Sequence, residues 1–208
     1  MKRLLLAVLL LLVAIPSVEA KRRETPEEIE RKTRHYSGWE WGASARFGLV
    51  FYELDHMRIT GESAVKAYQS QTKLGGNIML NGGYLINNHW RVGLEAGAQI
   101  QYNHTVVPIY ATAHYFYGKR KNCLFNFLNV GTNILFDKGA RFGALGAGGV
   151  GFRFQGPEKN HKIDIMVGYQ AIMMTPRPYL NGSYSFNAKD VRLQEVNQSV
   201  FIGIGVAF

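Results

Sequence analysis

Two groups of residues have types and spacings that could support chemistry. In the stretch LGAGGVGFRF, Gly146, Gly148 and Gly151 match the G-x-G-x-x-G spacing of a dinucleotide-binding turn. Glu95 and His114 would bring together a carboxylate and an imidazole, the components of a general base. Both interpretations depend on the elements that carry these residues, which the surrounding pattern predicts.

The glycine stretch lies inside a run in which apolar residues occupy every second position, as in a β-strand with one apolar face. A dinucleotide turn needs a strand before it, a helix after it and parallel βαβ units around it. Here the turn-like segment GPEKN (156–160) and another alternating run follow instead. We therefore interpret the glycines as strand residues that allow close approach, and we expect no cofactor.

Eight alternating runs follow one another along the chain. Each has roughly ten residues or more, the length that a tilted strand needs to cross a bilayer. In the fifth run, Asn126 and Thr132 interrupt the alternation and predict a slipped or bulged register. Short turns at one end alternate with connections at the other end, of which 53–72 and 175–195 are long and those near 102–106 and 137–140 are brief. Short turns at one end and longer loops at the other are typical of outer-membrane barrels. The runs occupy 38–52, 73–86, 89–101, 107–117, 123–136, 141–155, 162–171 and 196–208.

The N-terminal residues predict export from the cytoplasm. A basic start is followed by an apolar run over 4–15 and by a small-residue cleavage site that ends at Ala20. This run is shorter than the roughly 20 apolar residues of a membrane anchor, so we expect a cleaved signal peptide over 1–20. Residues 21–37 form a charged periplasmic segment, in which Thr25 and Pro26 predict a short helix near 26–34.

The composition limits the other classes of function. The chain has 208 residues, 23 glycines, a single cysteine and a formal net charge of +9. A single cysteine excludes an internal disulfide. A basic balance can indicate nucleic acid or anionic lipid, and the predicted location in the envelope favours lipid over nucleic acid.

The C-terminus adds the most specific feature, a final aromatic residue preceded by alternating apolar residues. With the signal peptide and the earlier runs, it makes residues 38–208 resemble the small outer-membrane β-barrel superfamily of Gram-negative bacteria, which includes the OmpA membrane domain and OmpX-like proteins. In that superfamily these positions are the signal read by the barrel-assembly machinery, here Val200, Ile202, Ile204, Val206 and Phe208.

The pattern and the resemblance together imply an all-β fold, an eight-stranded antiparallel up-and-down transmembrane barrel in the outer membrane. Outer-membrane lipid and lipopolysaccharide would surround it, and we expect a monomer that binds no nucleic acid. Closure satisfies every backbone polar group where lipid offers no hydrogen-bond partner. Aromatic residues near the strand ends, including Trp39, Trp41 and Trp90, are expected to form an interfacial girdle.

Polar residues on the inner faces predict a network inside the barrel, because an eight-stranded barrel is only wide enough for side chains to fill it. Acids and bases buried there would have to pair with one another. We expect a structural role for this network, which comprises Glu40, Arg46, Arg91, Glu95, His114, Arg153 and Asp164.

Three functions remain open. The first is a non-enzymatic barrel with a structural, adhesive or accessory role, in which the two long loops make the external contacts. The second is a narrow, porin-like channel for small solutes. The third is a lipid A-modifying enzyme that uses Glu95 and His114. The His-x-Ser motif of barrel deacylases matches only His35-Tyr36-Ser37, before the first strand. We favour the first function and expect no catalytic or metal site.

Overall fold

The computed structural model describes residues 26–28, 33, 38–59, 65–69, 72–101, 104–136, 140–155, 161–175 and 191–208. The chain divides into one unit that ends at Arg31 and a second that comprises Lys32–Phe208. The predicted signal peptide lies outside the described residues. Within the predicted helix, residues 26–28 are helical and Thr33 instead forms an isolated β-bridge with Arg120; the other positions lie outside the described part.

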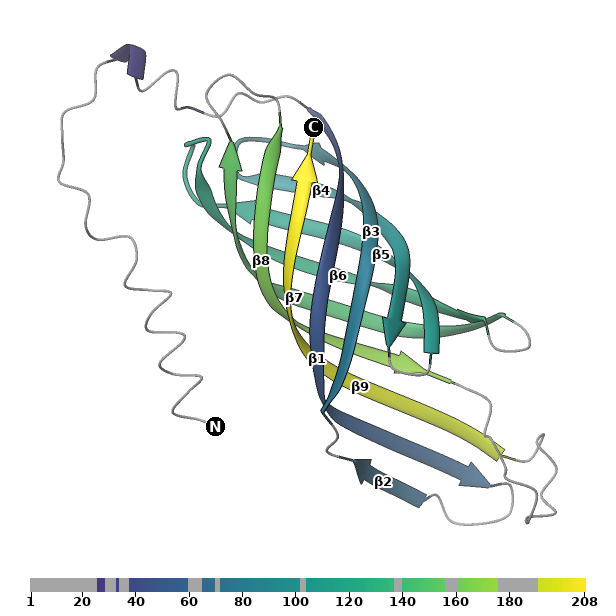
Figure 1. Cartoon of the computed structure of the whole chain (residues 1–208). Coiled ribbons are helices and arrows are strands. Elements are labelled where there is room, and N and C mark those ends of the chain that lie inside the picture. Colours follow the sequence, from purple (N-terminus) through teal and green to yellow (C-terminus); the bar gives the residue numbers. More distant parts are fainter. Residues whose placement is uncertain are drawn as a thin grey trace. The chain divides into compact units, whose positions relative to one another are not determined.

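The described strands of the second unit form one antiparallel sheet (Figure 1). Each long strand pairs with the next along the chain, and β1 pairs with β9 to close the barrel. Eight long strands therefore form the predicted up-and-down barrel, while the short β2 pairs with β1 alone. The strands are β1 (Trp39–Ile59), β2 (Val65–Gln69), β3 (Lys73–Leu85), β4 (Trp90–Gln101), β5 (His104–Phe116), β6 (Cys123–Phe136), β7 (Ala140–Gln155), β8 (Lys162–Met174) and β9 (Val191–Ala207).

The two ends of the barrel differ. At the turn end, the connections 86–89, 117–122 and 156–161 join consecutive strands. At the opposite end, which we call the loop end, β1 and β9 continue as a paired ribbon out to Ile59 and Val191 (Figure 1). The predicted loops 53–72 and 175–195 are therefore shorter than expected, because part of each extends the sheet.

The strand β6 is regular, so the predicted irregularity at 123–136 is wrong. Its pairings with β5 and β7 run without a shift in register. The interrupting polar residues find partners within the sheet: Asn126 Nδ2 donates to the Tyr117 hydroxyl at 2.6 Å, and the Thr132 hydroxyl donates to the Gly143 carbonyl at 2.8 Å. The register shift among the β1–β9 pairs lies instead between Val50 and Tyr52.

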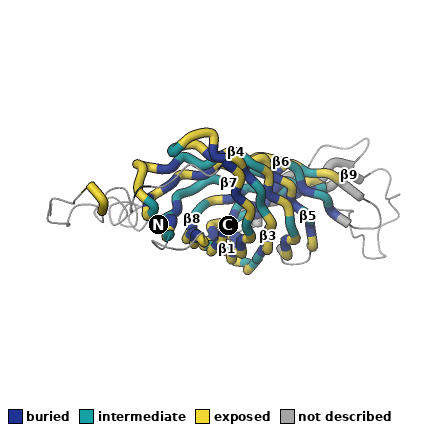
Figure 2. Tube along the Cα trace, turned by 90° about the horizontal axis from the view of Figure 1, so that it is seen from above, coloured by how far each residue is buried: buried dark blue, intermediate teal, exposed yellow. Residues whose placement is uncertain are grey.

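Outward-facing residues form an apolar belt. Figure 2 shows exposed and buried positions following one another along the strands. Ile78 and Leu80 are each 69% exposed, which a water-facing sheet would not favour. Aromatic rings border this belt. At the turn end Trp39 stacks on Trp41 and Trp90 contacts Tyr115, and toward the loop end Phe51 contacts Tyr169. A belt with aromatic borders is the surface of a membrane-spanning barrel.

The interior holds apolar as well as polar side chains, so it is less polar than the alternation suggested. Buried residues of the described strands form an apolar cluster that includes Phe125, Phe127 and Phe201. The glycine motif explains how these rings fit. A Cβ on Gly151 would lie 2.4 Å from the Phe125 ring, and one on Gly149 would lie 2.9 Å from the Phe127 ring. The glycines of LGAGGVGFRF are strand residues, and those on the inner face make room for rings from β6.

Candidate functional site

Glu40 lies at the centre of an ionic cluster near the turn end of the lumen. Its side chain is fully buried on β1, where three cations from β4, β7 and β8 surround it. Arg91 Nε lies 3.2 Å and Arg153 Nη1 lies 3.1 Å from Glu40 Oε2, and the Lys162 ammonium donates to Oε1. Arg153 also donates two hydrogen bonds of 2.8 Å to Asp164. Each buried charge therefore has an opposite charge beside it, as burial requires.

A second polar layer lies further along the lumen around Glu95 of β4. Arg46 Nη2 donates to both Glu95 oxygens at 2.6 Å, while Ser44 and Asn129 each donate at 3.0 Å. The Arg46 guanidinium also lies 5.4 Å from the centre of the Phe201 ring, a cation–π distance. Glu95 thus connects β1, β4 and β6 across the lumen.

Toward the loop end, a neutral layer follows. Gln170 donates to Gln99 at 3.1 Å and to the Tyr110 hydroxyl at 2.8 Å. The cavities between the layers are small, about 20 Å³ beside Glu95 and His114 and about 10 Å³ beside Gln99. A water molecule needs roughly 10–15 Å³. Where the described residues line it, the lumen is filled by side chains rather than by a column of water.

The structure does not join Glu95 to His114 as a general base. His114 lies opposite Arg91 in the β4–β5 pairing, whereas Glu95 lies opposite Tyr110. The His114 ring stacks on Phe125 at 5.4 Å with an interplanar angle of 3°. Glu95 instead accepts hydrogen bonds from Ser44, Arg46 and Asn129, so Glu95 and His114 do not form a paired base and acid.

A separate polar group lies at the loop end, beyond the ring of Phe51. Glu53 and Asp55 of β1 and Glu195 of β9 each have a carboxylate oxygen within 4.8 Å of the other two. Lys73 Nζ lies 2.5 Å from Glu53 Oε2. Burial, together with the nearby Asp55 and Glu53, raises the pKa of Glu195 to about 7. Burial and Glu53 also raise the pKa of Asp55. We call Glu53, Asp55 and Glu195 the rim carboxylates.

Of the predicted lumen residues, the structure brings six into ion pairs and leaves His114 among aromatic rings. Sequence reasoning missed the rim carboxylates, because 53–72 and 175–195 were interpreted as loops. The alternation of Glu53 and Asp55 along one face was the available signal, but it follows a bulge that reverses which positions point inward.

The closed sheet, the apolar belt and the aromatic borders define a small outer-membrane β-barrel. A comparison with solved structures finds the same fold in the outer membrane protein OprG from Pseudomonas aeruginosa, at 15% identity and a TM-score of 0.50 over 84% of this chain and 97% of that one. Also similar are Neisserial surface protein A (16% identity, TM-score 0.38, 84% and 100% covered) and Ail of Yersinia pestis (16%, 0.35, 83% and 100%).

Neither the comparison with protein-family models nor that with curated proteins finds a match. At 15% sequence identity, the likeness to OprG supports the fold of this chain alone. Among the described residues, no helix combines the length and the apolar character needed to cross a membrane.

Proposed function

We propose that this protein is a closed, non-enzymatic outer-membrane barrel that has a structural or adhesive role and contacts its surroundings through the loop end. The filled lumen is the observation that carries this proposal. Three side-chain layers, centred on Glu40, Glu95 and Gln170, cross the interior, and the two cavities described between them measure about 20 and about 10 Å³. Cavities of this size would hold no more than single water molecules, so layers packed in this way would keep larger solutes out.

The same geometry supports a non-enzymatic role. Catalysis by a general base needs the base within hydrogen-bond reach of a substrate proton. Glu95 is 4% exposed and is held by three donors inside the lumen. A lipid substrate in the surrounding bilayer would meet the apolar belt rather than this carboxylate. We propose that the external contacts are made by the β1–β2 region and by the connection between β8 and β9.

Conductance across a planar bilayer tests the closed lumen. We expect the refolded wild-type chain to give no stable current steps, because the Glu40 and Glu95 layers block the lumen. Replacing the middle layer with the double substitution Arg46→Ser and Glu95→Ser removes its two largest side chains together, without leaving one charge unpaired. The Glu40 and Gln170 layers remain in this variant, so it is expected to stay closed, and regular current steps from it would show that the middle layer alone closes the lumen.

A wild-type chain that opens in regular steps would contradict the closed lumen and favour the narrow channel. The double substitution Glu27→Gln and Lys119→Gln also removes one charge of each sign, but at exposed positions. It should stay as silent as the wild type. An altered lipid A profile that depends on Glu95 would contradict the non-enzymatic role.

A further inference from the structure

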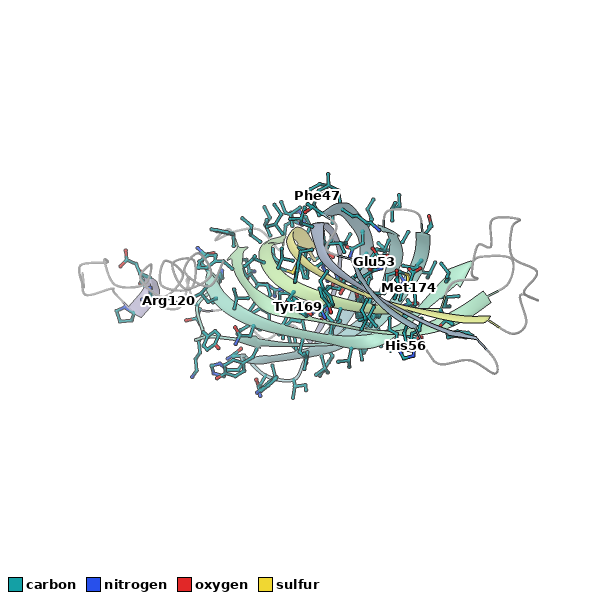
Figure 3. All side chains as sticks on the ribbon, turned by 90° about the horizontal axis from the view of Figure 1, so that it is seen from below. Phe47, Glu53, His56, Arg120, Tyr169 and Met174 are labelled. Carbon is teal, nitrogen blue, oxygen red and sulfur yellow. The ribbon has the colours of Figure 1, made fainter. Side chains whose placement is uncertain are left out.

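A small cavity lies in the lumen between the two charged layers. Its volume is about 20 Å³, and three arginines line it: Arg46 of β1, Arg91 of β4 and Arg153 of β7. All three are buried. Arg46 points inward, whereas its neighbour Phe47 is exposed on the outside of the barrel (Figure 3). Three positively charged side chains therefore meet around one small space.

Among the residues that the structure describes, the two charged layers carry one more positive than negative charge. Their cations are Arg46, Arg91, Arg153 and Lys162, their acids are Glu40, Glu95 and Asp164, and all of these are buried. Arginine stays protonated in proteins, so three of the four cations keep their charge. An uncompensated charge in the interior is costly. One monovalent anion would balance the two layers.

Polar atoms of residues that line the same cavity point to a ligand independently. Arg46 Nε and Nη1, the Thr112 hydroxyl and His114 Nδ1 are buried without a hydrogen-bond partner among the described residues. Thr112 and His114 lie two positions apart on β5, so both side chains are on its inner face, and His114 lies opposite Arg91. Buried polar atoms of this kind are rare and costly unless an ion or water satisfies them.

We propose that this cavity binds a chloride ion. Guanidinium nitrogens only donate hydrogen bonds, and a hydroxyl and an imidazole N–H donate as well, so an anion can accept from all of these groups at once. A water molecule would leave the excess positive charge in place. The cavity also selects by size. One water molecule needs roughly 10–15 Å³, so a space of about 20 Å³ has no room for sulfate or phosphate, with four oxygens around a central atom.

The bound ion would join β5 to the charged network. None of the charged residues of the two layers belongs to β5, which contributes Thr112 and His114 to the cavity. Chloride would connect these two side chains to Arg46 on β1. It would therefore stabilise the folded barrel from inside. This inference does not depend on the external contacts proposed for the loop end.

Urea titration of the refolded full chain in lipid vesicles tests the proposal, with sodium gluconate replaced stepwise by sodium chloride at constant ionic strength. Gluconate is too large for the cavity. An ion that binds only the folded chain raises the folding equilibrium constant by the factor 1 + [Cl⁻]/Kd. Once chloride exceeds its Kd, each tenfold increase should raise this constant about tenfold, as one ion per chain requires.

Two variants remove single donors and keep the shape of the side chain. His114→Phe retains a ring that can stack on Phe125 but lacks Nδ1, and Thr112→Val lacks the hydroxyl. Each should weaken chloride binding about tenfold or more, because hydrogen bonds to charged groups are strong. His161→Phe makes the same change at an exposed position and should respond to chloride as the wild type does.

Asn81→Asp gives a change of the opposite kind. Asn81 lines the cavity, and its Oδ1 accepts a hydrogen bond of 2.9 Å from Arg91 Nη2. An aspartate here would supply the missing negative charge from the protein itself. We expect this variant to be more stable than the wild type without chloride and to lose most of the dependence on chloride.

Migration of unboiled samples on gels shows that each variant is folded. A wild-type folding equilibrium constant that does not change with chloride would overturn the proposal and leave the cavity to water. Folded His114→Phe and Thr112→Val variants that respond to chloride as strongly as the wild type would also overturn it. If neither of these variants folds, a full chloride response in folded Asn81→Asp overturns it.

Discussion

Arg153 contacts side chains from three other strands inside the lumen. The alternation in the sequence predicts that Arg153 points inward, but not these contacts. Arg153 is 1% exposed, donates to both Glu40 and Asp164, and lies 4.5 Å from the centre of the Phe116 ring. Its flat guanidinium can serve two carboxylates at once because its five N–H groups form a rigid fork. The cost of burying this charge is offset only while both partners remain.

Substitution of Arg153 is therefore expected to destabilise the barrel. Arg153→Met leaves Asp164 without its paired donor and removes one of the three cations around Glu40, so unfolding in lipid vesicles should become easier by about 3–5 kcal/mol. Arg153→Lys keeps the charge but loses the fork, and should lie between Met and the wild type. Equal stabilities of the Met variant and the wild type in urea titrations would argue against the network's structural role.

At the residue scale, period-two alternation predicts which side chains face inward but not which of them meet. Glu40 and Arg153 are 113 positions apart and come together only because the barrel closes. The rim carboxylates could not be predicted for a second reason. The bulge between Val50 and Tyr52 reverses the inward positions of β1, and beyond the membrane the outer face no longer needs to be apolar. The alternation that marks a membrane strand therefore ends before the strand does.

At the scale of elements, β6 and β7 show how a small barrel accommodates large rings. Phe125 of β6 lies opposite Gly151 of β7, and Phe127 lies opposite Gly149. Each ring lies beside the glycine opposite it, in space that a Cβ atom would otherwise occupy. Gly146 of the same motif has only a backbone oxygen at 3.8 Å from its would-be Cβ, so its surroundings are open. The glycines of one motif therefore have different roles.

This difference predicts a contrast between two matched substitutions on β7. Gly151→Ala places a methyl group 2.4 Å from the Phe125 ring and should destabilise the barrel by about 1–3 kcal/mol through overpacking. Gly146→Ala should have little effect, because its methyl group meets no close neighbour. The temperature at which unboiled protein loses its folded migration reports both. Equal losses for the two variants would contradict the packing described for Phe125.

At the scale of the whole molecule, the sequence predicts the fold better than the lumen. Lipid forces closure because unpaired backbone groups are costly in hydrocarbon, so eight alternating runs leave few alternatives to an up-and-down barrel. The packing of the interior depends instead on registers and ring orientations that period two does not encode. The apolar cluster of Met79, Phe116 and Phe125 beside the ionic layers is one such feature.

Heat-modifiable migration of the protein from an outer-membrane fraction tests the central claim most directly. A closed barrel resists detergent without boiling, so the unboiled chain should migrate differently from the boiled chain and should be found in the outer-membrane fraction. Identical migration of boiled and unboiled samples, with the protein recovered in soluble form from the periplasm, would contradict the membrane barrel and the closed lumen together.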